Sequence, residues 1–232
     1  MGELRHMLRD DDVNHEEQKQ ILELGMKFRA DRFYHRPFEG PQGVAVIFDK
    51  PSTRTRSSFS IGVAELGGYP LVIDKSGSQL GRGEPVADTA EVLTRMAYGI
   101  VWRTFEQSRV EQMARVATVP VVNALTDEFH PCQVLADFLT LAQFKGGVDN
   151  LENLKIAYVG DAANNMSNSY LLAGAVGVKD LSGPVGIVSM MSEVGKESAT
   201  KAAAFSNFAY FSAFIAVNLA VMNMLPLPAL DG

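Results

Sequence analysis

Residues 44–56 read Val-Ala-Val-Ile-Phe-Asp-Lys-Pro-Ser-Thr-Arg-Thr-Arg, and this stretch decides the fold. Its first five residues, 44–48, are all apolar, which predicts a buried parallel strand. Pro51 ends that strand, because proline lacks the N–H group that a sheet ladder needs. The Ser/Thr/Arg cluster after it opens an amphipathic helix, which we expect at about residues 52–66. A strand, a tight turn and a helix start therefore follow one another directly.

The start of this predicted helix is suited to bind an oxyanion. The first N–H groups of a helix lack intrahelical acceptors, and the helix dipole favours negative charge there. Ser52, Thr53 and Thr55 add hydroxyl donors. Arg54 and Arg56 add guanidinium groups, whose forked donors match a phosphate. The alternative for a Ser-Thr-Arg triplet is a plain N-cap followed by two solvated arginines.

Strand-like and helix-like segments alternate along the rest of the first half. Apolar runs predict strands at residues 69–74, 100–102 and 119–122, and helical periodicity predicts helices at about 86–97, 106–116 and 131–144. Asn14 and Glu17 have the spacing of a capping box, so we expect a first helix here that packs on the sheet. The alternation predicts an α/β fold, with a parallel sheet covered by helices on both faces.

Composition excludes several classes of protein. The chain has 232 residues, 47% of them hydrophobic, which is enough for one large domain or two small ones. Its net charge of −6 and the lack of a Lys/Arg-rich run argue against nucleic acid as a partner. The single cysteine, Cys132, excludes an intrachain disulfide. The first 12 residues are highly charged and unlike a signal peptide, so we expect the first half to be cytoplasmic.

Further polar motifs follow the predicted strands. Arg103 comes directly after the strand at 100–102, and His130-Pro131-Cys132-Gln133 follows the strand at 119–122. Open α/β sheets place their ligands at the carboxyl ends of the strands, so we expect Arg103, His130 and residues 52–56 to converge at one edge. The alternative for Arg103 is a surface ion pair. The alternative for His130 is a helix-cap position in which the ring nitrogens have hydrogen-bond partners.

The nine residues 48–56 resemble the carbamoyl-phosphate signature of the aspartate and ornithine carbamoyltransferases, and His-Pro-Cys-Gln matches their H-P-x-Q motif. The resemblance covers about residues 1–177. It implies that carbamoyl phosphate is bound by Ser52, Thr53, Arg54, Thr55, Gln79, Arg103, His130 and Gln133. In that family the arginine holds the carbonyl and phosphate oxygens, the histidine polarises the carbonyl and the glutamine binds the carbamoyl NH₂. The reaction needs neither a metal nor another cofactor.

Two motifs point to the ornithine branch of the family. Gln79, in the Gly-rich segment at residues 76–84, matches a loop that reaches the active site of the neighbouring subunit, which implies a homotrimer. Asn165 matches the residue that contacts the amino-acid substrate. The implied reaction transfers the carbamoyl group to L-ornithine, giving citrulline and phosphate, as in arginine biosynthesis. An ordinary flexible connection for Gln79 and a helix cap for Asn165 are the alternatives.

The resemblance divides the chain into three parts. A carbamoyl-phosphate-binding domain covers residues 1–145, and the start of an ornithine-binding domain covers residues 146–177, with a strand at 155–161 and a helix at 164–176. Gly146 and Gly147 are the expected hinge. The later ornithine-binding motifs of the family do not occur after residue 177. We therefore expect an incomplete second domain and impaired activity.

Residues 178–232 form an apolar tail of different character. No charged residue occurs between 202 and 230, and a helix over 202–225 would be about 36 Å long, enough to cross a bilayer. A buried core helix is the alternative. The end of the tail is similar to that of site-2-type membrane zinc proteases, but the chain has no H-E-x-x-H motif to join Asp231 at a metal. A chimeric chain that binds phosphate at most therefore competes with a carbamoyltransferase-like enzyme.

Overall fold

The computed structural model describes residues 4–151, 156 and 164–173. Most of the strand predicted at 155–161, and the whole apolar tail with its candidate span at 202–225, lie outside the described residues. Within the described part of the chain, no helix combines the length and the apolar character that crossing a bilayer requires.

Four parallel strands form the sheet in the described part of the chain, in the order β2-β1-β3-β4. They are β1 (Gly43–Phe48), β2 (Tyr69–Asp74), β3 (Gly99–Arg103) and β4 (Val121–Leu125). β4 begins two residues later than predicted, because Pro120 has no N–H to give to a ladder. The Pro120 carbonyl still accepts a hydrogen bond from the Ile100 N–H, at 2.9 Å.

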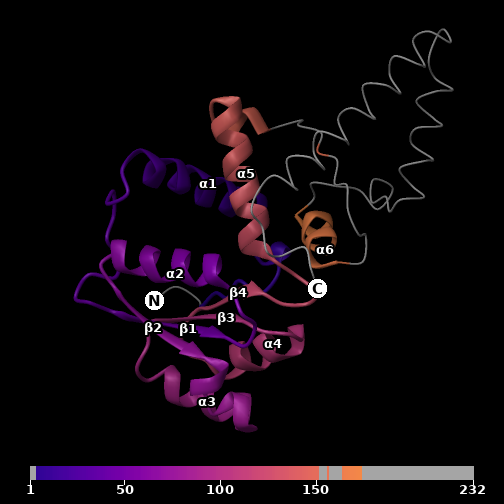
Figure 1. Cartoon of the computed structure of the whole chain (residues 1–232). Coiled ribbons are helices and arrows are strands. Elements are labelled where there is room, and N and C mark those ends of the chain that lie inside the picture. The colour runs from indigo at the N-terminus through magenta and orange to yellow at the C-terminus, as the bar shows by residue number, and fades with distance from the viewer. Residues whose placement is uncertain (1–3, 152–155, 157–163, 174–232) are drawn as a thin grey trace, which may run out of the picture. The chain divides into compact units, whose positions relative to one another are not determined.

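Helices cover both faces of this sheet, as predicted, with α3 and α4 on one side and α2 and α5 on the other (Figure 1). The helices of the described residues are α1 (His15–Ala30), α2 (Thr53–Glu65), α3 (Val86–Leu93), α4 (Gln107–Val116), α5 (Pro131–Lys145) and α6 (Asn165–Leu172). Short 3₁₀ turns lie at Asp10–Asp12, Lys75–Gly77, Leu80–Arg82 and Val148–Leu151. α3 is shorter than the predicted helix at 86–97.

The core is divided by the pleat of β1. Side chains of a strand alternate between the two faces, so Ile47 packs in the cluster that contains Met113 of α4, whereas Val46 packs with Val63 of α2. Trp102 of β3 is completely buried in the first cluster. The central strands are thus apolar on both faces, which explains their continuous hydrophobic sequence.

The first helix begins as predicted but packs elsewhere. Asn14 and Glu17 form the capping box, each side chain accepting the other residue's backbone N–H at 2.9 Å. However, α1 packs mainly on α5 rather than on the sheet, with Leu22 in a cluster with Val134 and Phe138. The reason is that α2 and α5 already cover this face (Figure 1).

The N-terminal segment covers the free edge of β4. Met7 forms an isolated parallel bridge with Val122; its N–H donates to the Val121 carbonyl at 2.9 Å, and its carbonyl accepts from the Asn123 N–H at 2.8 Å. Pairing of this kind satisfies backbone groups that would otherwise be left open at a sheet edge.

At the other end of the described chain, Gly146 terminates α5 with a φ of 80°, a left-handed conformation that favours glycine. Asn164 caps α6 by accepting the Ser167 N–H at 3.1 Å. α6 then packs on α5 through Met166 and Tyr170. The predicted domain boundary at residue 145 stays a prediction.

Candidate active site

The carboxyl ends of β1, β3 and β4 meet at one edge of the sheet. Phe48 is opposite Arg103 in the register of β1 and β3, and Arg103 is opposite Leu125 in that of β3 and β4. The second register shifts between Trp102 and Arg103, so that β4 contains one extra residue at this point. Irregularities of this kind re-aim the side chains next to them. The shift lies where Arg103 leaves the sheet.

Asp49 anchors the turn between β1 and α2. Its Oδ2 accepts hydrogen bonds from Trp102 Nε1 at 3.1 Å and Thr104 Oγ1 at 2.6 Å, and Arg109 lies 3.5 Å away. The carboxylate is buried, so these partners provide the compensation that a buried charge needs. Sequence reasoning missed this role. The only available signal was an acidic residue directly after an apolar strand.

The two arginines at the start of α2, Arg54 and Arg56, differ in their contacts. The Ser52 hydroxyl accepts the Thr55 N–H at 3.3 Å, so the N-cap alternative is correct for this residue. Arg56 is paired with Asp74 and stacks over the Phe48 ring at 5.5 Å. It is therefore held by the protein and is not a free phosphate ligand. Arg54, by contrast, is exposed and forms no hydrogen bond or ion pair with the described residues, and Thr53 is exposed beside it.

Lys50 joins this turn to the loop that follows β4. Its ammonium forms an ion pair with Asp127 and lies 4.8 Å from the centre of the Phe105 ring. The Asp127 N–H also donates to the Phe105 carbonyl, at 2.7 Å. These contacts tie together the three segments that follow β1, β3 and β4.

Arg103 lies close enough to His130 for its charge to act on the imidazole. Burial lowers the pKa of Arg103, its Nε is buried without a hydrogen-bond partner, and no ion pair among the described residues includes it. The surface ion pair considered as an alternative is therefore absent from the described part. A half-buried cation without a carboxylate favours binding of an anion.

His130 is held in its neutral form. Burial, and secondarily the charge of Arg103, lower its pKa to about 4, while the charge of Asp137 opposes the change. His130 is the N-cap residue of α5, as the alternative proposed, but its side chain makes no capping hydrogen bond and its Nδ1 is buried without a partner. A neutral imidazole can donate an N–H to a carbonyl oxygen.

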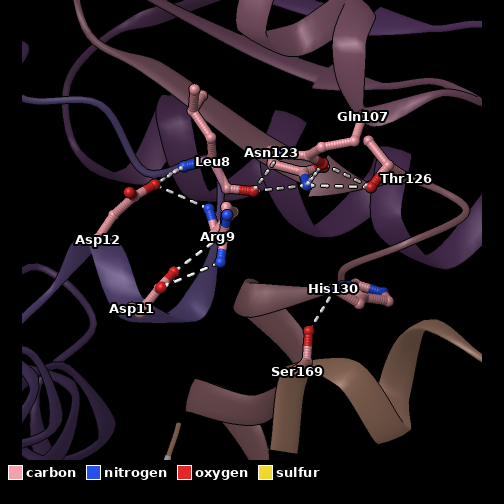
Figure 2. A network of polar contacts seen from close by, with 9 residues as sticks. All are labelled: Leu8, Arg9, Asp11, Asp12, Gln107, Asn123, Thr126, His130 and Ser169. Atoms are coloured by element: carbon pink, nitrogen blue, oxygen red, sulfur yellow. Dashed lines mark hydrogen bonds and ion pairs between the residues drawn. The ribbon is translucent and has the colours of Figure 1, made fainter. Parts of the chain in front are cut away.

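A polar network fixes the backbone around His130 (Figure 2). Thr126 Oγ1 donates to Gln107 Oε1 at 2.8 Å, and Asn123 Nδ2 donates to the Leu8 carbonyl at 2.9 Å. The Ser169 hydroxyl of α6 accepts the His130 N–H at 2.7 Å. Sequence reasoning missed these residues, because their partners lie far away along the chain.

Asp10 is a buried acid next to Ser169. Burial raises its pKa to about 6, and a hydrogen bond with the Ser169 side chain opposes that change. Its Oδ2 has no hydrogen-bond partner. The N-terminal segment thus reaches α6, and through Ser169 it reaches the backbone of His130.

The predicted ornithine contact takes part in the same arrangement. Asn165 Nδ2 donates to the Thr126 carbonyl at 2.9 Å, and the cap residue of α6 is Asn164, so Asn165 is not merely a helix cap. Gln133 lies on the first turn of α5, where its Nε2 donates to Asp137 Oδ1 at 2.9 Å.

Gln79 is exposed next to the 3₁₀ turn Leu80–Arg82, and its side chain makes no hydrogen bond with the described residues. The structure does not bring Gln79 into contact with the other candidates, and its role stays a prediction. No group of three or more His, Cys, Asp or Glu side chains within the described ranges is arranged to hold a metal ion.

The family model and the curated relatives that match this chain indicate the same family. The model of the aspartate/ornithine carbamoyltransferase carbamoyl-P binding domain matches residues 5–143. An ornithine carbamoyltransferase of Bifidobacterium longum is 77% identical over 186 residues, covering 79% of this chain and 58% of the relative. One of Mycolicibacterium paratuberculosis is 56% identical over 170 residues, covering 73% of this chain and 54% of the relative.

Solved structures agree. The ornithine carbamoyltransferase of Pyrococcus furiosus matches with a TM-score of 0.69 and 40% identity, over 78% of this chain and 58% of that one. That of Burkholderia thailandensis matches with a TM-score of 0.66 and 42% identity, over 74% of this chain and 58% of that one. The chain spans a little over half the length of the relatives that it matches. It belongs to the aspartate/ornithine carbamoyltransferase family.

Proposed function

We propose that this chain supplies the carbamoyl-phosphate side of an ornithine carbamoyltransferase site, which transfers the carbamoyl group to L-ornithine and yields citrulline and phosphate. The observation that carries the proposal is the half-buried Arg103, which has no ion-pair partner among the described residues, beside the neutral His130. The names of the close relatives support the choice of ornithine.

The roles follow from the chemistry of the groups. The α2 start, with Ser52, Thr53, Arg54 and Thr55, binds the phosphate through N–H, hydroxyl and guanidinium donors. Arg103 neutralises the charge that develops on the carbonyl and phosphate oxygens, and His130 donates an N–H to the carbonyl oxygen. Gln133 accepts a hydrogen bond from the carbamoyl NH₂. The side-chain amine of ornithine attacks the carbonyl carbon, the bond to the phosphate oxygen breaks and the amine loses a proton.

Asn165 belongs to the ornithine side of the proposed site, and Gln79 reaches the site of a neighbouring subunit in a homotrimer. We propose residues 1–145 as the carbamoyl-phosphate domain and 146–177 as the beginning of the ornithine domain, in the cytoplasm, with no metal or cofactor. For the apolar tail, the resemblance to a membrane protease and the membrane contact at 202–225 rest on sequence alone, and we propose no activity for it.

Binding and turnover are tested separately. Titration calorimetry with carbamoyl phosphate compares the full chain with Arg54→Ala, for which we expect about 2 kcal/mol weaker binding because a charge-assisted contact is lost. Arg95→Ala is the control, since this exposed arginine precedes β3 at the opposite edge of the sheet. Equal affinity of Arg54→Ala and wild type would show that the phosphate site is misassigned.

Turnover is measured as citrulline formed from carbamoyl phosphate and ornithine by the full chain. Citrulline production that is lost in Arg103→Met supports the complete proposal. A chain that binds carbamoyl phosphate but forms no citrulline retains the binding role and overturns catalysis by this chain alone.

A further inference from the structure

Asp137 connects α5 and α6 beside the candidate site. It lies one helical turn after Gln133, and its Oδ1 accepts a hydrogen bond from Gln133 Nε2 at 2.9 Å. Its Oδ2 accepts a hydrogen bond from the Tyr170 hydroxyl of α6, at 2.5 Å. Both carboxylate oxygens are therefore occupied by donors from different helices. The Gln133 N–H donates to the His130 carbonyl at 3.0 Å, so Gln133 lies on the helical turn that begins at His130.

This arrangement determines which end of the Gln133 amide is free. Gln133 Nε2 donates to Asp137 Oδ1, so the amide turns its NH₂ group toward Asp137. The opposite end, the Oε1 carbonyl, is then directed away from Asp137. A glutamine without such a partner exchanges its two ends at little cost, whereas this one presents an acceptor.

Pairs of this kind at i and i+4 also occur on ordinary helix surfaces, where they contribute little to stability. Here Tyr170 holds the second carboxylate oxygen, and its ring packs edge-on against Phe138, with 6.5 Å between the ring centroids. The carboxylate is thus fixed by a second helix, which an isolated surface pair lacks.

We propose that Asp137 is a positioning residue that makes Gln133 an acceptor for the carbamoyl NH₂, and so selects carbamoyl phosphate over acyl phosphates that lack an N–H group. This inference rests on the proposed function of the site. It adds a specificity device to that site, made of Asp137 and Tyr170.

The test compares two ligands that differ at one group. Acetyl phosphate has a methyl group where carbamoyl phosphate has NH₂, so it has no hydrogen to donate to Gln133. Calorimetry on the full chain measures both affinities at low temperature. We expect Asp137→Asn to weaken carbamoyl phosphate binding by about tenfold, because the amide loses its fixed orientation, and to leave acetyl phosphate binding unchanged.

Further variants separate orientation from folding. Gln133→Ala should lower the preference for carbamoyl phosphate as Asp137→Asn does, and the double variant should lower it no further. Tyr170→Phe should lower it by a smaller factor. The control is Glu16→Gln, since Gln20 Nε2 and Glu16 Oε1 form the same kind of pair, at 3.1 Å, on α1.

The outcomes distinguish failure of the Asp137 inference from failure of the proposed function. An unchanged preference in Asp137→Asn overturns the inference alone, and equal losses for both ligands overturn it by showing a purely structural role. A wild-type chain that binds neither ligand overturns the proposed function, and this inference with it.

Discussion

Replacing Asp10 with asparagine should increase the sensitivity of folding stability to acid. Asp10 is only 5% exposed, and burial raises its pKa from 3.8 to about 6. Burial and the charge of Arg103 lower the pKa of His130 from 6.5 to about 4. The two groups titrate in the same pH range, and they affect the free energy of unfolding in opposite directions.

The signs follow from proton binding. Between pH 6.5 and about 4, the unfolded chain binds a proton at His130 that the folded chain does not, so lowering the pH favours unfolding. Between about pH 6 and 3.8, the folded chain binds a proton at Asp10 that the unfolded chain does not, so lowering the pH favours folding.

The two effects oppose each other, and that of His130 is the larger. From about pH 7 to about pH 5, His130 lowers the free energy of unfolding by about 2 kcal/mol, and Asp10 raises it by about 1 kcal/mol. We therefore expect the free energy of unfolding of the wild-type chain to fall by about 1 kcal/mol over this range. In Asp10→Asn the value should start higher, because a buried charge is gone, and then fall by about 2 kcal/mol.

Urea unfolding followed by the fluorescence of Trp102 measures this directly, since Trp102 is the single tryptophan and is completely buried. Asp88→Asn is the control, because it removes an exposed carboxylate on α3. If Asp10→Asn and wild type gave parallel profiles of unfolding free energy against pH, the assigned pKa of Asp10 would be wrong.

Three further predictions concern single positions. Asp49→Asn should lower the free energy of unfolding by about 2 kcal/mol or more, because Arg109 and two hydrogen-bond donors lose their shared carboxylate, and unchanged urea unfolding would contradict this. Gly68→Ala should destabilise the chain by about 1–3 kcal/mol, because the new Cβ would lie 2.8 Å from the Gln42 carbonyl oxygen. Gly62→Ala, inside α2, should stabilise the chain by about 0.5–1 kcal/mol, because its Cβ would meet no atom within 4 Å and alanine favours the helix. Melting temperatures in the reverse order would refute this pair. The Cys132 thiol is only partly exposed, and its pKa is raised to about 12, chiefly by burial, so iodoacetamide should label the folded chain far more slowly than the chain in urea, as followed by mass spectrometry; equal labelling rates would refute this.

Local patterns were sufficient to predict most elements of the fold. β2 begins and ends at the predicted residues, and the α1 capping box forms as expected. The predicted start of β4 differs by two residues, because the apolar run at 119–122 contains Pro120, which has no N–H for the sheet ladder. The prediction that α1 packs on the sheet was wrong, because hydrophobic periodicity identifies an apolar helix face but not the element that covers it.

Some features of the candidate site could be predicted from the sequence, and others could not. The proximity of Arg103 and His130 was predictable, because the carboxyl ends of parallel strands share an edge. The burial of Asp49 against Trp102 and Thr104 was not, since those partners are 53 and 55 residues away. The link from Asp10 through Ser169 to His130 was also hidden, because it joins two regions far apart in the chain.

The bridge between Met7 and Val122 has a consequence for synthesis of the chain. Residue 7 leaves the ribosome long before β4 exists, and its backbone partners are the Val121 carbonyl and the Asn123 N–H. At the usual rate of translation the delay is on the order of ten seconds. During that time β1, β2 and β3 can already assemble, whereas the backbone groups of Met7 have no strand β4 with which to pair. We therefore expect this segment to be among the last parts of the nascent sheet to become protected against proteolysis.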